Sequence, residues 1–148
     1  MENRQKPALG ASTGWACKKD ISLLRGTINT FWLYNRPLSN SHTEYQRTLT
    51  AVRERLNTHR AAIVCSGIAE LGAIALDRAN KNQDAADHFA AHPKVYGKST
   101  PEIIERFTRL AKEDRKDVKR AELLIARIET EGLPPEVVDY DPVVGVKR

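Results

Sequence analysis

The sequence contains few aromatic residues, only two cysteines and no long uninterrupted hydrophobic segment. Aromatic residues make up 6% of the 148 residues. The longest apolar run, from Ile63 to Leu76, is broken by Glu70 and bordered by charged residues, whereas a membrane-spanning helix needs about 20 apolar residues. The first residues are polar and lack the apolar block of a secretory signal. We therefore expect a cytoplasmic or otherwise intracellular protein with no membrane partner.

The sequence also lacks the short motifs that mark common active sites. Cys17 and Cys65 match no metal-binding or redox spacing, so we interpret them as reduced thiols. There is no phosphate-binding glycine loop, no dinucleotide fingerprint, no zinc-protease pair of histidines and no nucleophile elbow. Nothing in the sequence supports an enzyme or a cofactor, and we expect neither.

The residues that are abundant favour helices. Hydrophobic residues make up 41% and charged residues 29%, and Ala, Leu, Arg, Lys and Glu are common. This composition predicts an all-α protein, a helical bundle of about four to five helices with a long C-terminal helix and extended N- and C-terminal arms. We divide the chain into an N-terminal arm (residues 1–19), a helical domain (20–132) and an extended tail (133–148).

Hydrophobic spacing and capping residues predict where the helices lie. The first runs from Asp20 to about Asn35, and the second begins at a capping pattern at 43–46. A central helix covers 63–80 after a bend near Ser66-Gly67, and a short separate helix covers 82–92. The long helix begins near Thr100 and ends at Glu131, because Gly132, Pro134 and Pro135 follow.

Two helical patterns predict surfaces that pack against other helices. Cys65, Ala69 and Ala73 recur every four residues and form a ridge of small side chains on a helix that we expect to be surrounded by protein. The long helix carries a heptad seam whose middle is thin and partly charged. We expect the end of that helix to pack against a second copy or another protein. The seam consists of Ile104, Phe107, Ala111, Asp114, Val118, Ala121, Ile125 and Ile128.

The positive charge of the chain lies in its first part. Residues 1–60 contain ten Lys and Arg against four Asp and Glu, whereas the whole chain has a net charge of +5. Basic side chains with interspersed aromatics are typical of contacts with nucleic acids, although a solvated arginine-rich face gives the same pattern. The candidate contacts are Lys18, Lys19, Arg47, Arg53, Arg55 and Arg60.

One weak pattern resembles a metal site. Asp84, His88 and His92 are spaced four residues apart, which places two imidazoles and a carboxylate on one helix face. Acids at the start of a helix and a histidine at its end also complement the helix dipole, and this second interpretation is favoured. The prediction is therefore a non-enzymatic interaction or assembly protein that binds other copies or a larger partner through helix faces and terminal arms. The alternative is a nucleic-acid-binding accessory protein.

Overall fold

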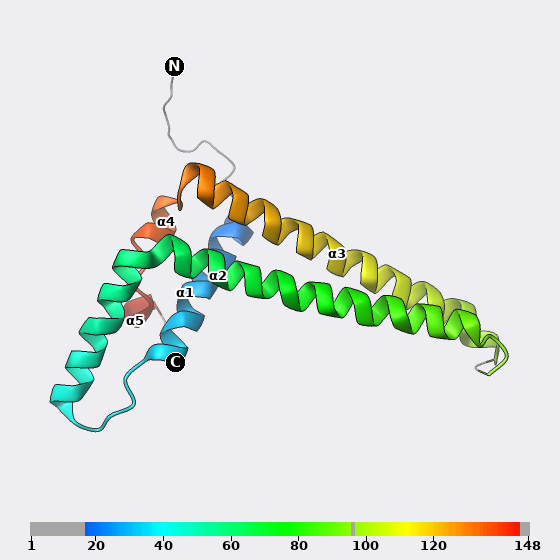
Figure 1. The fold of residues 1–148 in the computed structure, drawn as a ribbon, viewed down its shortest axis with the longest axis horizontal. Helices are drawn as coiled ribbons and strands as arrows, with labels where there is room; N and C mark the ends of the chain where they lie inside the picture. Colours follow the sequence, from blue (N-terminus) through cyan, green and yellow to red (C-terminus); the bar gives the residue numbers. More distant parts are fainter. Residues whose placement is uncertain (1–16, 96, 146–148) are drawn as a thin grey trace, which may run out of the picture. The chain divides into compact units, whose positions relative to one another are not determined.

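A computed structural model describes residues 17–95 and 97–145, and every regular element in these residues is a helix (Figure 1). The elements are α1 (Lys18–Asn35), α2 (His42–Ala91), a short 3₁₀ turn η3 (Gly97–Ser99), α3 (Thr100–Glu131), α4 (Pro135–Val138) and α5 (Pro142–Gly145). The all-α prediction and the long helix near the C-terminus are confirmed. The predicted arm lies outside the described residues up to residue 16, and its last residues belong to the start of α1.

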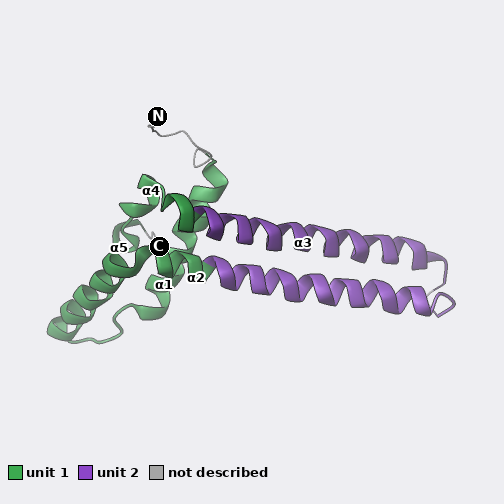
Figure 2. Ribbon diagram, turned by 45° about the horizontal axis from the view of Figure 1, so that its top comes forward, with its two compact units in different colours: residues 1–67, 128–148 green, residues 68–127 purple. Residues whose placement is uncertain are grey.

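The chain forms two compact units, shown in different colours in Figure 2. Unit 1 combines the residues up to Gly67 with those from Ile128 onward. Unit 2 consists of Ile68–Arg127. Both α2 and α3 therefore contribute residues to each unit, so the division does not follow the ends of the helices.

Unit 1 is built around the apolar stripe that the sequence predicts for α1. Leu24 and Ile28 are fully buried, and Trp32 forms a cluster with Leu49 and Val52 of α2. Three half-buried side chains complete this cluster: Phe31, Tyr45 and Val143. The contribution of Val143 shows that the C-terminal segment helps to cover the core of unit 1.

Unit 2 is an antiparallel helical hairpin in which the second part of α2 lies beside α3 (Figure 2). The two backbones come close where Gly72 faces Ala121, since a Cβ placed on Gly72 would lie 3.1 Å from the Ala121 Cβ. The rings of Phe89 and Phe107 stack with their centroids 5.8 Å apart. The hairpin turns through Gly97, whose φ of 71° is a conformation that favours glycine.

Helix α2 is longer than the sequence patterns predict. The expected separate helix at 82–92 does not exist, because α2 is continuous from its kink at His59 to Ala91. The bend expected near Ser66-Gly67 lies instead at His59, where α2 is kinked and has its only non-helical backbone angles (φ −123°, ψ 27°). The polar residues near Asn82 that suggested a new helix start instead lie within a continuous helix.

The C-terminal tail is not extended as predicted. It forms the short helices α4 and α5, and both of them contact α1. Pro134 and Val137 are fully buried, so the tail is part of the packed structure of unit 1. The alternating valines suggested an extended segment, but the prolines at the first positions of α4 and α5 favour helical turns.

Candidate interaction surfaces

The predicted seam of α3 is covered by the chain itself. All of its members are buried or half-buried, and Phe107, Asp114 and Ala121 contact α2 within unit 2. The heptad pattern therefore identified the packing face of α3 correctly. This face packs against α2 of the same chain, and the expected contact of the end of the helix with a second copy or another protein stays a prediction.

The polar member of the seam is satisfied by two side chains of α2. The Arg78 Nε donates to Asp114 Oδ1 at 3.2 Å, and the Asn82 Nδ2 donates to Asp114 Oδ2 at 2.9 Å. The Asp114 side chain is only 15% exposed, whereas that of Arg78 is 52% exposed. A carboxylate with partners on both oxygens can be tolerated in a thin helical interface, and it fixes the register of α2 against α3.

The predicted ridge of small residues is wrong as a packing surface of this chain. Ala69 and Ala73 are exposed, and Cys65 is half-buried. The helix face that packs in unit 2 is rotated away from them and contains Ile68, Ala75 and Ala79, all of which are buried. A repeat of four residues was too short a pattern to distinguish between these neighbouring faces.

A consequence is that much of the apolar part of α2 lies on the surface. Leu71, Ile74 and Leu76 are 43%, 46% and 47% exposed. An 18-residue stretch of α2 with a mean hydropathy of 1.3 is apolar enough to cross a membrane by length and composition, and only 17% of it is buried. One such helix is weak evidence for a membrane span. The exposure of this stretch contradicts our expectation that it is surrounded by protein.

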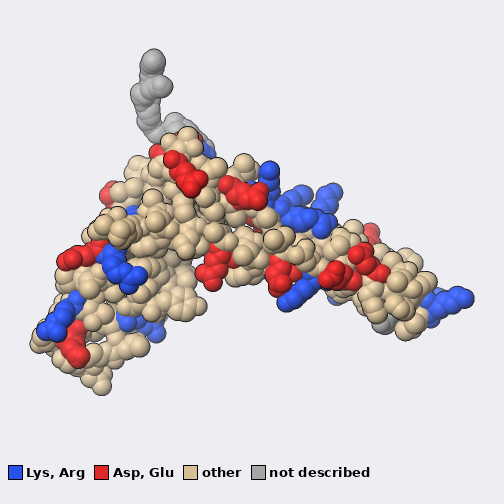
Figure 3. Space-filling view, viewed as in Figure 1, with Lys and Arg blue, Asp and Glu red and all other residues tan. Residues whose placement is uncertain are grey.

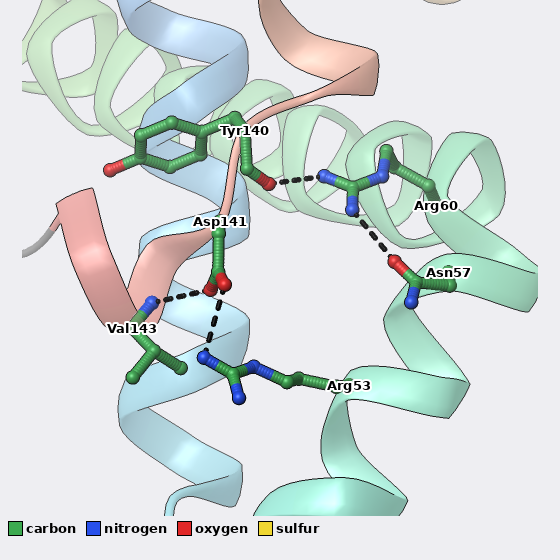
Figure 4. Close-up of polar contacts among 6 residues, drawn as sticks. All are labelled: Arg53, Asn57, Arg60, Tyr140, Asp141 and Val143. Carbon is green, nitrogen blue, oxygen red and sulfur yellow. Dashed lines mark hydrogen bonds and ion pairs between the residues drawn. The ribbon is translucent and has the colours of Figure 1, made fainter.

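In unit 1 the arginines of α2 bind the C-terminal segment (Figure 4). The Arg60 Nη1 donates to the carbonyl oxygens of Val137 at 3.1 Å and Tyr140 at 2.7 Å. The Arg53 Nη2 forms an ion pair with Asp141 at 3.1 Å, and the other oxygen of that carboxylate accepts the backbone N–H of Val143. These contacts hold the chain between α4 and α5 against α2.

The tail is also held from α1. The Tyr140 hydroxyl donates to Asn29 Oδ1 at 2.7 Å, and the Arg25 Nε donates to the carbonyl oxygen of Glu136 at 3.0 Å. The Arg25 guanidinium lies 5.1 Å from the centre of the Tyr140 ring. Burial lowers the pKa of Arg60, while the nearby carboxylates of Asp141 and Asp139 oppose that shift. The direction shows that desolvation is the larger effect at this side chain.

These contacts change the interpretation of the six candidate nucleic-acid residues. Arg53 and Arg60 bind the tail, and Arg55 donates to Asn35 while lying over the Phe31 ring. Lys18, Lys19 and Arg47 are exposed. The structure therefore places half of the set in contacts within the chain and does not bring the six together on one surface.

The structure also shows the surroundings of the candidate metal ligands and of the two cysteines. Among the described residues, no group of three His, Cys, Asp or Glu side chains is arranged to hold a metal ion, so Asp84, His88 and His92 do not converge. The His92 Nδ1 instead lies 2.9 Å from the carbonyl oxygen of His88. Both cysteines are free, and burial together with Glu129 raises the pKa of Cys65, which makes it a poor nucleophile.

The fold and these surfaces define an all-helical protein with a tail-bound unit and a two-helix hairpin. In comparisons with known proteins, the chain matches no family model, no curated protein and no solved structure.

Proposed function

We propose that this protein is a non-enzymatic assembly protein that associates through the outer face of α2 in unit 2. The observation that supports this proposal is the exposure of Leu71, Ile74 and Leu76 on an apolar helix. A hairpin of two helices has only one internal interface, so the opposite side of each helix faces outward. Leu71 and Ile74 lie three residues apart on one side of the helix and Leu76 lies on its other side, and exposed large apolar side chains of this kind are typical of protein interaction sites.

The chemistry of the described residues is consistent with this proposal. Burial raises the pKa of Cys65, which disfavours its thiolate, and Arg78, Lys81 and Arg109 form ion pairs between and along α2 and α3. In unit 1, Arg53, Arg60 and Tyr140 form hydrogen bonds or ion pairs that hold the tail against α1 and α2.

The test is the concentration dependence of the mass of the full-length protein in sedimentation velocity. We expect the wild type to associate at micromolar concentrations, and Leu76→Glu to weaken association by about tenfold or more, because burial of a leucine side chain contributes about 1.5–3 kcal/mol. Leu38→Glu is the matched control, since Leu38 is 86% exposed and lies outside unit 2.

Two results would contradict the proposal. The first is a wild-type protein that stays monomeric at high micromolar concentration and binds no purified protein partner. The second is binding to lipid vesicles that Leu76→Glu abolishes, without any association in solution, because this would assign the apolar face to a membrane.

The exposure of Lys18, Lys19 and Arg47 supports the alternative function, which is binding to a nucleic acid. Binding to mixed-sequence DNA or RNA should then weaken steeply with salt, since phosphate contacts release counterions. Replacing Lys18 and Lys19 by alanine should lower the affinity further, whereas equal binding by this variant and the wild type would contradict the alternative.

A further inference from the structure

The outer faces of the two helices of unit 2 carry opposite charges. On α2, Glu70, Asp77 and Asp84 are exposed and spaced seven residues apart, which places them on one face of the helix, where Lys81 forms an ion pair with Asp77 at 2.9 Å and leaves the face net acidic. On α3, four exposed basic side chains between Arg109 and Lys119 follow one another at spacings of three and four, while the acidic Glu113 and Asp117 of the same stretch lie to one side of this row. This basic row consists of Arg109, Lys112, Lys116 and Lys119. Figure 3 shows Lys and Arg side chains along the middle of α3, and mainly Asp and Glu side chains along the outer face of α2.

Each charged row has an apolar part beside it. Leu123 continues the spacing of the basic row on α3 and is 60% exposed. On α2, the acidic row is flanked by the small exposed side chains Ala69 and Ala73 and by Leu76. One face thus offers a large projecting side chain, and the other offers small side chains with space between them.

The two faces also lie at the same level along the hairpin. Within the chain, Gly72 is level with Ala121, and Arg78 and Asn82 are level with Asp114. The acidic row therefore occupies the same stretch of the hairpin as the basic row on the opposite side. By the same register, Leu123 is close to the level of Ala69 and Ala73.

We propose that unit 2 associates head to tail, with the outer face of α2 in one copy packing against the outer face of α3 in a second copy. Stacking two hairpins side by side without a shift would set the basic row opposite the acidic row and place Leu123 between Ala69 and Ala73 of the neighbour. This proposal rests on the proposed function and names the second copy as the partner of the apolar face.

Charge complementarity favours this arrangement over a symmetric contact. Two α2 faces packed against each other in antiparallel fashion would bring the acidic row against its own copy, and two α3 faces would do the same with the basic row. In the head-to-tail contact the two surfaces differ, so a pair of copies still presents one free α2 face and one free α3 face. Association should then continue beyond a dimer, either into a closed ring or into longer stacks.

The experiment uses two full-length charge-reversal variants in sedimentation velocity. One carries Lys112→Glu, Lys116→Glu and Lys119→Glu, and the other carries Glu70→Lys, Asp77→Lys and Asp84→Lys. Each variant alone should associate at least about tenfold more weakly than the wild type, because like charges then face each other. An equimolar mixture of the two should associate again, since each α2 face meets an α3 face of opposite charge.

Matched controls separate this contact from general effects of charge and folding. A variant with Lys94→Glu and Lys98→Glu changes two exposed lysines of the same unit outside both rows and should associate like the wild type. Leu123→Glu changes a single exposed residue and should also weaken association by about tenfold. Far-UV circular dichroism should show wild-type helix content for every variant.

The possible failures are distinguishable. If the α3 variants and Leu123→Glu associate like the wild type while Leu76→Glu does not associate, the apolar face of α2 has a different partner and the head-to-tail contact is wrong. If the α2 charge variant mixed with the wild type associates more tightly than either protein alone, and the α3 charge variant associates like the wild type, the contact is a symmetric one between two α2 faces. A monomeric wild type that binds a purified protein partner would overturn the head-to-tail contact alone, whereas one that binds no such partner would overturn the proposed function itself.

Discussion

Helices α1 and α2 of unit 1 approach each other closely at Gly67. A Cβ placed on Gly67 would lie 2.7 Å from the Cβ of Thr27, whose buried hydroxyl already donates to the carbonyl oxygen of Leu24. We expect Gly67→Ala to lower the free energy of unfolding by about 1–3 kcal/mol through overpacking. Gly26→Ala is the control, because nothing lies within 4 Å of its added Cβ and removing a helical glycine should stabilise the protein by about 0.5–1 kcal/mol. Urea unfolding of both variants measures the difference.

Arg60 of α2 donates two hydrogen bonds to the tail. Its Nη1 donates to two tail carbonyls and its Nη2 donates to Asn57 Oδ1 at 3.1 Å. Arg60→Ala should destabilise the protein by about 1–3 kcal/mol, because the carbonyls lose a charged donor. Arg47→Ala at an exposed position should change stability by less than about 0.5 kcal/mol in the same urea titration. Equal stability of the two variants would show that the tail is held without these hydrogen bonds.

The raised pKa of Cys65 predicts a pH dependence that can be measured chemically. Burial first, and Glu129 second, disfavour the thiolate in the folded protein. At pH 8 iodoacetamide should therefore modify Cys65 more slowly in the native protein than in urea, as followed by mass spectrometry. Above the pKa of the unfolded thiol, the unfolded chain loses a proton that the folded chain retains, so Cys65 should reduce stability as pH rises. Equal modification rates in the native and unfolded states would contradict this interpretation.

At the scale of the elements, the ends of α1 and α3 could be predicted because local chemistry determines them. Gly132 has a φ of 81° and its N–H donates to the carbonyl oxygen of Ile128, which ends α3 where the sequence suggests. The continuity of α2 could not be predicted in this way. Asn82 looks like a helix cap in the sequence, yet in the hairpin its side chain donates to Asp114 of α3. A tertiary contact therefore determines its role.

The pairing of α2 with α3 predicts an energetic coupling at Asp114. Asp114→Ala would remove the acceptor of both Arg78 and Asn82 and should lower the free energy of unfolding by about 1–2 kcal/mol. Asp117→Ala is the control, since Asp117 is 61% exposed and reaches Arg78 only at 4.0 Å. In the double variant with Asp114→Ala and Arg78→Ala, the loss of unfolding free energy should be smaller than the sum of the losses in the two single variants. Additive effects would mean that the pair at 3.2 Å contributes no coupling.

At the scale of the whole molecule, the sequence identified which faces are apolar but not what covers them. The seam of α3 was correctly predicted to pack, yet its partner is the same chain, while Ala69 and Ala73 were predicted to pack and are exposed. Helical periodicity defines a face only in relation to its own helix. Which of two adjacent faces is buried depends on how the chain turns back at Gly97.

The tail gives a prediction that involves all of unit 1. A chain ending at Leu133 would lose the fully buried Val137 and the contacts of Tyr140 and Asp141 with α1 and α2. We expect faster amide hydrogen exchange in α1 and in the first part of α2, measured by mass spectrometry, and little change in residues 75–120 of unit 2. Unchanged exchange in α1 would show that the tail does not stabilise this unit.

The opposite charges on the two sides of unit 2 also give the hairpin an electric dipole across its width. The two rows are separated by the thickness of two helices, about 20 Å, which exceeds the Debye length of about 8 Å at physiological ionic strength. A molecule that approaches one side therefore experiences a field of one sign. An encounter between two such hairpins would be oriented before their surfaces touch.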